Sequence, residues 1–196
     1  DPDREHCEKA LRSLDHLVVI DIFLTETAAL ADVVLPATSW GETDGVCTNT
    51  ERRVQRLRAA VPPPGEAMPD WWIIGELGKR LGLDGFDFDS AKEVFNELCE
   101  LSPIYTGLDW DRIDEGKYQW PVPEKDHPGT PILHEGEFKI GRGLFRVINY
   151  REPAETISDD YPVWLTTGRR LQAYHTRTQT GRAQGIDYLL AEESLE

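Results

Sequence analysis

Arginine is concentrated in two short segments of this chain of 196 residues. The residues concerned are Arg52, Arg53, Arg56, Arg58, Arg169, Arg170, Arg177 and Arg182. A planar guanidinium group donates a fork of hydrogen bonds that matches a phosphate or a carboxylate. Each segment is therefore a candidate anion site. The alternative is that neighbouring acids such as Glu51 pair these arginines on a solvated surface.

The second segment offers the widest choice of hydrogen-bonding groups. Between Thr166 and Arg182 the chain carries hydroxyls, arginine forks, the imidazole of His175, and backbone amides next to Gly168 and Gly181. A ligand with several phosphate oxygens or ring nitrogens would use these groups, because glycine lets the backbone approach a ligand closely. A structural hydrogen bond is the alternative role of His175 taken alone.

Charge and composition exclude several classes of partner. The chain has 21 Lys+Arg against 36 Asp+Glu and a net charge of -15, so it is unsuited to the polyanionic backbone of nucleic acids. Its longest aliphatic run, Leu17 to Ile20, is too short to span a membrane. A single bound phosphate is still compatible with this acidity, because salt screens exposed charges beyond roughly 8 Å.

The three cysteines are Cys7, Cys47 and Cys99, and none is close to another in the sequence. They form no C-x-x-C pair and have no histidine at the spacing of a metal ligand. We therefore expect no metal ligand in this chain. An odd number of unpaired cysteines is typical of a reducing compartment, which favours a cytoplasmic location.

Residues 1–100 predict alternating helices and strands, the pattern of a parallel α/β domain. Apolar residues at helical spacing predict a helix from Cys7 to Leu14. Apolar runs at 17–22 and 33–35 predict two strands of a parallel sheet that is buried on both faces. Thr25 is the expected N-cap of a short helix between these strands.

Two longer helices are predicted next. Asp70 is expected to cap the first, which ends before Gly82, and Ser90 and Glu93 form a capping box for the second. The expected apolar face of the first helix consists of Ile73, Ile74, Leu77 and Leu81. Residues 101–136 hold five prolines and predict a long extended connection.

The pattern after Glu137 changes to the two-residue alternation of β-structure. A hairpin is predicted around a turn at 141–143, and Tyr161 to Thr167 predicts a further strand. We expect an incomplete β-domain here, with strand edges open to solvent and with association or disorder near Glu196.

Several spaced motifs resemble the large subunit of molybdopterin-dependent oxidoreductases. They are Ala31-Asp32-Val33-Val34-Leu35-Pro36, Ser39-Trp40-Gly41-Glu42, Asp44-Gly45, Thr48-Asn49-Thr50-Glu51-Arg52-Arg53-Val54-Gln55, Pro64-Gly65-Glu66-Ala67 and Asp70-Trp71. The strand that leads into Thr167-Gly168-Arg169, with Tyr174-His175-Thr176, resembles the opening of that family's molybdopterin-dinucleotide-binding domain.

Further motifs are most similar to formate dehydrogenase alpha subunits. They are Asp21-Ile22-Phe23-Leu24-Thr25-Glu26-Thr27-Ala28, Gln119-Trp120-Pro121 and His127-Pro128-Gly129-Thr130. The resemblance covers nearly the whole chain, which corresponds to a carboxyl-terminal fragment of such a subunit. Two positions differ from relatives: Ala173 stands where many have His, and Thr43 stands where some nitrate reductases have Lys.

The resemblance implies a fold in three parts. Residues 1–100 would be the end of a parallel α/β domain, and residues 101–155 an extended connection with a hairpin. Residues 156–196 would start a β-barrel-like molybdopterin-dinucleotide-binding domain.

The resemblance also implies a share of a cofactor site. Family members hold molybdenum, or in some cases tungsten, between two molybdopterin guanine dinucleotides. Asp70 matches the position whose carboxylate receives the guanine N–H groups, a role that suits an acceptor-only side chain. A plain helix N-cap is the alternative role of Asp70. The matching positions for one pterin and its pyrophosphate are Thr167, Gly168, Arg169, Tyr174, His175 and Thr176.

No catalytic residue and no metal ligand is assigned to this chain. In relatives the metal-ligating cysteine or selenocysteine, its neighbouring histidine, the substrate arginine and the cysteines of a 4Fe-4S cluster lie upstream. The complete subunit would oxidise formate to carbon dioxide and pass electrons to other subunits, and we expect the isolated chain to be inactive. The alternatives are a nitrate reductase or another enzyme of the same superfamily, and a non-catalytic binding module.

Overall fold

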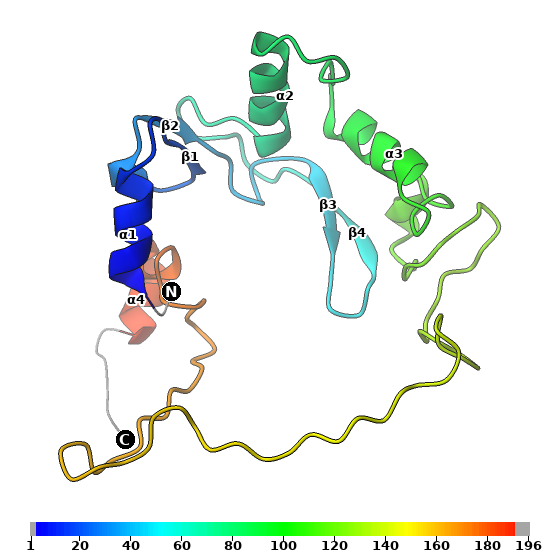
Figure 1. The fold of residues 1–196 in the computed structure, drawn as a ribbon. Helices are drawn as coiled ribbons and strands as arrows, with labels where there is room; N and C mark the ends of the chain where they lie inside the picture. Colours follow the sequence, from blue (N-terminus) through cyan, green and yellow to red (C-terminus); the bar gives the residue numbers. More distant parts are fainter. Residues whose placement is uncertain (1–2, 191–196) are drawn as a thin grey trace. The chain divides into compact units, whose positions relative to one another are not determined.

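The structure, a computed structural model, describes residues 3–190 of the chain. Contacts group the chain into two compact units, divided between Glu135 and Gly136. The first unit combines helices with two small sheets and is a mixed α/β structure, as the sequence predicts (Figure 1). Among the described residues, no helix is long and apolar enough to cross a membrane. The boundaries at 100 and 155 stay predictions.

The first sheet is the predicted parallel pair. Helix α1 (Arg4–Arg12) precedes strand β1 (Val18–Asp21), which pairs in parallel with β2 (Val33–Pro36). The crossover contains a short 3-10 helix, Ala28–Leu30, and the Thr25 hydroxyl accepts the N–H of Ala28 at 3.2 Å. The expected burial of both faces is not found, because no residue of β1 or β2 is buried within the described chain.

The second sheet is a hairpin that the sequence reading missed. Strand β3 (Gly45–Thr48) pairs antiparallel with β4 (Val54–Leu57). The turn is organised by Asn49, whose side-chain oxygen accepts the N–H groups of Glu51 at 2.9 Å and of Arg53 at 3.0 Å. Asparagine favours such turns because its side chain bonds to the backbone two residues on.

Helices α2 (Asp70–Arg80) and α3 (Ala91–Leu101) lie close to their predicted bounds. The capping box of α3 is formed: Ser90 Oγ accepts the N–H of Glu93 at 3.3 Å, and the Glu93 carboxylate accepts the N–H of Asp89 at 2.8 Å. Asp70 does not cap α2, because Pro69 occupies the N-cap position.

The apolar face expected for α2 is largely open to solvent. Of its four members only Ile73 is buried, whereas Ile74 is 51% exposed and Leu81 is 75% exposed. Periodicity identified the helix correctly, but it does not say whether an apolar stripe finds a partner within the same unit.

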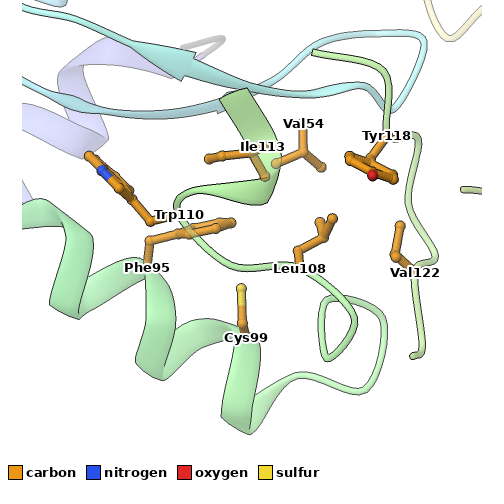
Figure 2. Close-up of a cluster of buried hydrophobic side chains, with 8 residues drawn as sticks. All are labelled: Val54, Phe95, Cys99, Leu108, Trp110, Ile113, Tyr118 and Val122. Atoms are coloured by element: carbon orange, nitrogen blue, oxygen red, sulfur yellow. The ribbon is translucent and has the colours of Figure 1, made fainter. Parts of the chain in front are cut away.

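The hydrophobic core of the first unit joins α3 to the hairpin and to the segment that follows α3. Figure 2 shows Phe95 and Cys99 of α3 facing side chains of that segment. The buried cluster consists of Val54, Phe95, Cys99, Leu108, Trp110, Ile113, Tyr118 and Val122. The proline-rich stretch after α3 therefore folds into the core in its first part.

Within residues 136–190, the regular structure of the second unit consists of short helical turns. They are the 3-10 helices Thr180–Arg182 and Tyr188–Leu190 and the single helical turn α4 (Gln184–Asp187). The predicted hairpin is reduced to a single bridge. Phe138 and Gly141 exchange backbone hydrogen bonds at 3.1 and 2.8 Å, but the predicted strands do not extend from them.

The strand predicted at 161–167 is likewise absent, and no closed barrel forms within residues 136–190. Val163 and Leu165 are 79% and 82% exposed. A strand pattern needs partner strands to become a sheet, because isolated pairs of strands are marginal in water.

Candidate functional site

Asp70 is the first residue of α2, and its side chain is exposed. Its carboxylate makes no capping bond to the helix. A carboxylate in the first turn is favoured by the positive end of the helix dipole, which lowers the cost of holding a negative charge there. The oxygens of the Asp70 carboxylate are therefore not used to begin its own helix.

The segment before α2 places Asp70 at the carboxyl end of the parallel sheet. Met68 donates its N–H to the Pro36 carbonyl at 3.1 Å, and its own carbonyl accepts the N–H of Thr38 at 3.2 Å. Ala37 and Met68 form a parallel bridge directly after β2. In open α/β folds, ligands bind beyond the carboxyl ends of the strands, so the position of Asp70 suits a ligand contact.

Thr38 adds an unsatisfied group to the same end of the sheet. Its side-chain hydroxyl has no hydrogen-bond partner in the described chain, although the residue is only 6% exposed. Buried hydroxyls are normally paired, since an unpaired one costs free energy. The donor set at this end of the sheet, a free carboxylate together with an orphaned hydroxyl, is compatible with the guanine of the expected cofactor.

A groove of about 360 Å³ lies between β2 and α2. Its lining is mostly apolar and includes Leu35, Trp72 and Leu77, together with the charged residues Glu76 and Arg80. Glu76 forms ion pairs with Lys79 and, at 2.6 Å, with Arg80. The hydrogen bond from Lys79 is the main reason why the pKa of Glu76 is lowered. Asp70 does not line this groove.

The first arginine cluster is engaged inside the chain. Arg52 donates to the carbonyls of Trp120 and, at 2.9 Å, Pro131. Both Arg56 and Arg58 donate to one oxygen of Asp114, at 3.1 and 2.8 Å.

Two further contacts complete the internal role of this cluster. Arg56 also lies 3.7 Å from the centre of the Trp110 ring, and Arg53 donates to the Gly116 carbonyl at 3.2 Å. The structure thus favours pairing within the chain over the anion site as the role of these four residues. Within residues 3–190, Glu51 forms an ion pair with Arg53 only, at 3.5 Å, so most partners of the cluster lie far away in the sequence.

The predicted pterin-contacting residues all lie in the second unit and are exposed. Thr167, Gly168 and Arg169 belong to a stretch without regular structure. A Cβ added to Gly168 would meet nothing within 4 Å, so no close contact with the described part of the chain requires glycine at this position. Free hydroxyl, amide and guanidinium donors suit a pyrophosphate, and the donor set therefore fits the expected group.

Tyr174, His175 and Thr176 lie in a compact loop. The rings of Tyr174 and His175 are stacked with their centres 4.1 Å apart. The loop is closed by a bond from the Tyr174 N–H to the Thr180 hydroxyl at 3.3 Å, and by the hydroxyls of Thr176 and Thr178, 3.1 Å apart.

The backbone of this loop is unusual at its centre. His175 has φ 48°, a left-handed conformation that is uncommon outside glycine. Non-glycine residues in this region cluster at functional sites, where surrounding structure maintains the strain. His175 is therefore presented on a strained turn with its ring against Tyr174, which the sequence pattern could not predict.

The predicted site residues fall into two groups. Asp70 belongs to the first unit and the other six to the second. Within the second unit the structure brings Tyr174, His175 and Thr176 together in one loop. No cluster of three or more His, Cys, Asp or Glu residues that could bind a metal ion occurs in residues 3–190.

Comparison with known proteins gives a consistent result. Residues 1–80 match the family model described as molybdopterin oxidoreductase. The chain is 51% identical over 189 residues to the F420-dependent formate dehydrogenase subunit alpha of Methanocaldococcus jannaschii, covering 95% of this chain and 28% of that protein. It is 46% identical over 199 residues to the F420-dependent formate dehydrogenase 2 subunit alpha of Methanococcus maripaludis, covering 100% and 29%.

A relative with a different name is also similar. The chain is 42% identical over 195 residues to the assimilatory nitrate reductase catalytic subunit of Bacillus subtilis, covering 94% of this chain and 28% of that protein. The chain thus spans 28 to 29% of the length of these three relatives.

Proposed function

We propose that this chain belongs to the molybdopterin oxidoreductase family, whose model matches residues 1–80, and that it is a segment of a formate dehydrogenase alpha subunit. The whole subunit would bind molybdopterin guanine dinucleotide and oxidise formate to carbon dioxide. The 51% identity with a formate dehydrogenase alpha subunit over 95% of the chain is the observation that carries this proposal.

The chain's own contribution is cofactor binding. The exposed carboxylate of Asp70 would accept the guanine amino and ring N–H groups, because an ionised carboxylate is acceptor-only and provides two oxygens. Glutamine or asparagine would bring an N–H donor to the same place. The fit is supported by the absence of a capping bond at Asp70 and by the neighbouring Thr38 hydroxyl, which lacks a partner in the described chain.

The loop of the second unit would hold one pterin and its pyrophosphate. Arg169 would supply a fork of donors to phosphate oxygens, and Thr167, Gly168 and Thr176 would supply hydroxyl and backbone N–H groups. The stacked rings of Tyr174 and His175 would form one side of this site, with a ring N–H available to the ligand.

When bound, a molybdenum or tungsten centre supplies the two-electron redox chemistry of the reaction, and the protein supplies binding, orientation and electrostatics. A 4Fe-4S cluster would be held by the upstream part of the subunit. The residues named above bind and orient, and none of them is assigned a proton-transfer step. The proposed partners are the upstream part of the subunit and electron-transfer subunits, in the cytoplasm.

The proposed domain organisation assigns residues 1–100 to the α/β molybdopterin oxidoreductase domain and residues 101–155 to a connection. Residues 156–196 would begin a barrel-like dinucleotide-binding domain. Exposed apolar residues in this last segment, such as Leu165 at 82% and Leu171 at 97%, support this assignment, because a complete domain would cover them.

The test uses the complete subunit, produced without oxygen and with molybdate or tungstate supplied. We expect formate-dependent reduction of an artificial electron acceptor and release of guanine nucleotide on acid treatment. The isolated chain of 196 residues, given the same cofactor, is expected to show no formate oxidation. A complete subunit that carries the cofactor but does not oxidise formate would contradict the proposal.

A nitrate reductase is the second candidate, supported by the 42% identity with an assimilatory nitrate reductase. Both candidates would share the cofactor contacts named above, so cofactor content does not separate them. The same preparation should therefore be supplied with nitrate and a reduced dye. Reduction of nitrate without oxidation of formate would favour this second function.

A further inference from the structure

The loop that carries Tyr174, His175 and Thr176 contains a turn closed by its own backbone. The Arg177 N–H donates to the Tyr174 carbonyl at 3.0 Å and so closes a turn of four residues. His175 is the second residue of this turn and has φ 48°. Turns with a positive φ at this position are dominated by glycine, asparagine and aspartate. A histidine there depends on surrounding contacts to keep its conformation.

Thr180 provides such a contact at the start of the turn. Its hydroxyl oxygen accepts the N–H of Tyr174 at 3.3 Å. Thr180 is also the first residue of the 3-10 helix Thr180–Arg182, so this acceptor belongs to an element of regular structure. The backbone of Tyr174 is thus held at both of its polar groups, at the N–H by Thr180 and at the carbonyl by Arg177.

The same 3-10 helix is joined to the other end of the turn. Gly181 donates its N–H to the Arg177 carbonyl at 2.9 Å, and the Arg182 guanidinium donates to the Thr178 carbonyl at 3.0 Å. A Cβ added to Gly181 would lie 3.4 Å from the Cβ of Arg177, so the helix and the turn are close together. The turn and the helix therefore form one loop, residues 174–182, which the chain's own hydrogen bonds close.

We infer that Thr180 is the positioning residue of this loop, and that its hydroxyl holds His175 in the conformation that receives the cofactor. Thr180 acts through the backbone of Tyr174 and not through a contact of its own with the ligand. The inference rests on the proposed function, since it takes Tyr174, His175 and Thr176 as contacts of the pterin and its pyrophosphate.

The benefit of this bond is expected in binding and not in stability. A loop that is fixed before a ligand arrives loses less conformational freedom when the ligand binds. Tyr174 and His175 are exposed, so the turn adds little to the packing of the second unit. The Thr180 hydroxyl should therefore raise the affinity for the cofactor and leave the melting temperature of the cofactor-free subunit nearly unchanged.

Three variants of the complete subunit separate these effects. Thr180→Val removes the hydroxyl and keeps a branched side chain of similar size, whereas Thr180→Ser keeps the hydroxyl. Thr156→Val is the matched control, because Thr156 is an exposed threonine of the same unit that lies outside the loop.

The first readout is amide hydrogen exchange at Tyr174 in the complete subunit prepared without cofactor. We expect Thr180→Val to accelerate this exchange at least about tenfold, because the N–H loses its acceptor. In Thr180→Ser and in Thr156→Val the rate should stay within about threefold of the wild type. Equal exchange at Tyr174 in Thr180→Val and in the wild type would overturn the inference.

The second readout is the guanine nucleotide released by acid, per mole of complete subunit. We expect Thr180→Val to hold about three- to tenfold less than the wild type, the effect of losing one neutral hydrogen bond. Thr180→Ser should restore the wild-type content, and Thr156→Val should not change it. A lower melting temperature of cofactor-free Thr180→Val, or a serine variant that restores nothing, would assign Thr180 to folding alone and overturn the inference.

The inference and the proposed function can fail separately. If the wild type holds guanine nucleotide and Thr180→Val holds as much, the positioning role of Thr180 is refuted and the proposed function stands. If the wild-type subunit holds no guanine nucleotide, the proposed function is refuted and the inference with it. Support requires faster exchange at Tyr174 and loss of nucleotide at an unchanged melting temperature, both reversed by serine.

Discussion

Arg52 and Trp120 are joined through both their backbones and their side chains. The Trp120 N–H donates to the Arg52 carbonyl at 3.0 Å. The Arg52 guanidinium in turn donates to the Trp120 carbonyl and lies 5.7 Å from the centre of the indole ring. A further bond reaches the Pro131 carbonyl at 2.9 Å. One arginine thereby fastens the turn between β3 and β4 to two points of the segment that follows α3.

Replacing Arg52 with lysine tests the importance of its two guanidinium hydrogen bonds. Arg52→Lys keeps the charge but cannot donate to two carbonyls in fixed directions, so we expect it to lower the free energy of unfolding by about 1–3 kcal/mol. Urea denaturation followed by tryptophan fluorescence measures the change. Arg58→Lys is the control, because Arg58 is 61% exposed and its ion pair with Asp114 should contribute under about 1 kcal/mol. Equal losses in both variants would contradict the role assigned to Arg52.

The partners of Arg52 and its neighbours could not be predicted from the sequence. The sequence shows the arginine cluster and allows two roles for it, an anion site or pairing with neighbouring acids. Its actual partners are mainly backbone carbonyls and Asp114, more than fifty positions along the chain. Such contacts depend on tertiary structure, and spacing in the sequence carries no signal for them.

The regular elements were predictable wherever a local rule decides them. The apolar runs of β1 and β2 and the Ser90–Glu93 capping box contain their own signals, and these elements are present. Strands of the second unit depend on distant partners, and the alternation at 161–167 produced no strand in the described chain. Asn49 was the available signal for the missed hairpin, since two backbone N–H groups converge on its side chain.

The fold requires glycine at position 107, as it requires arginine at position 52. A Cβ added there would lie 2.1 Å from the carbonyl oxygen of Glu124, and the Gly107 N–H bonds to Val122 at 2.7 Å. We expect Gly107→Ala to lower the free energy of unfolding by about 1–3 kcal/mol or more, because a backbone atom cannot move aside as a side chain does. Gly41→Ala is the control, since a Cβ at Gly41 meets nothing within 4 Å. Thermal denaturation of both variants measures the difference, and a Gly107→Ala protein as stable as its control would refute the close approach.

The buried thiol of Cys99 is expected to make the protein less stable at alkaline pH. Burial raises the pKa of its thiol from 9.0 to about 11, and the carboxylates of Asp109 and Glu100 add to this effect. The pKa in the folded protein exceeds that in the unfolded chain, so the folded state holds this proton more tightly. This contribution to stability is fully present below the unfolded pKa and is lost as pH rises from about 9 to about 11.

The measurement for Cys99 is the urea midpoint at about pH 8 and about pH 10. Cys99→Ala should be less stable at the lower pH, because it leaves a cavity, but its midpoint should fall less on going to the higher pH. Cys47→Ala provides the comparison, since Cys47 is exposed. At neutral pH we also expect iodoacetamide to modify Cys47 and to leave Cys99 unmodified. A wild-type pH dependence retained in Cys99→Ala would exclude the thiol as its source.

Asp70 provides the direct test of the proposed cofactor contact. Asp70→Asn replaces one acceptor oxygen by an N–H donor that would face the guanine N–H groups, and the loss of a charged hydrogen bond is worth about 1.5–3 kcal/mol. We therefore expect the affinity of the complete subunit for guanine dinucleotide to fall about 10- to 100-fold. Because Asp70 makes no capping bond to α2, the melting temperature of the cofactor-free subunit should hardly change.

Asp84→Asn is the matched control for Asp70→Asn, since Asp84 is also exposed and carries the same charge. The readout is the guanine nucleotide released by acid from each purified variant, per mole of subunit. Normal nucleotide content in Asp70→Asn would show that this carboxylate does not contact the cofactor. A loss of nucleotide accompanied by a lower melting temperature of the cofactor-free subunit would instead assign Asp70 to the stability of α2. The proposed contact with guanine requires three results together. Asp70→Asn loses nucleotide, its melting temperature without cofactor is unchanged, and Asp84→Asn retains its cofactor.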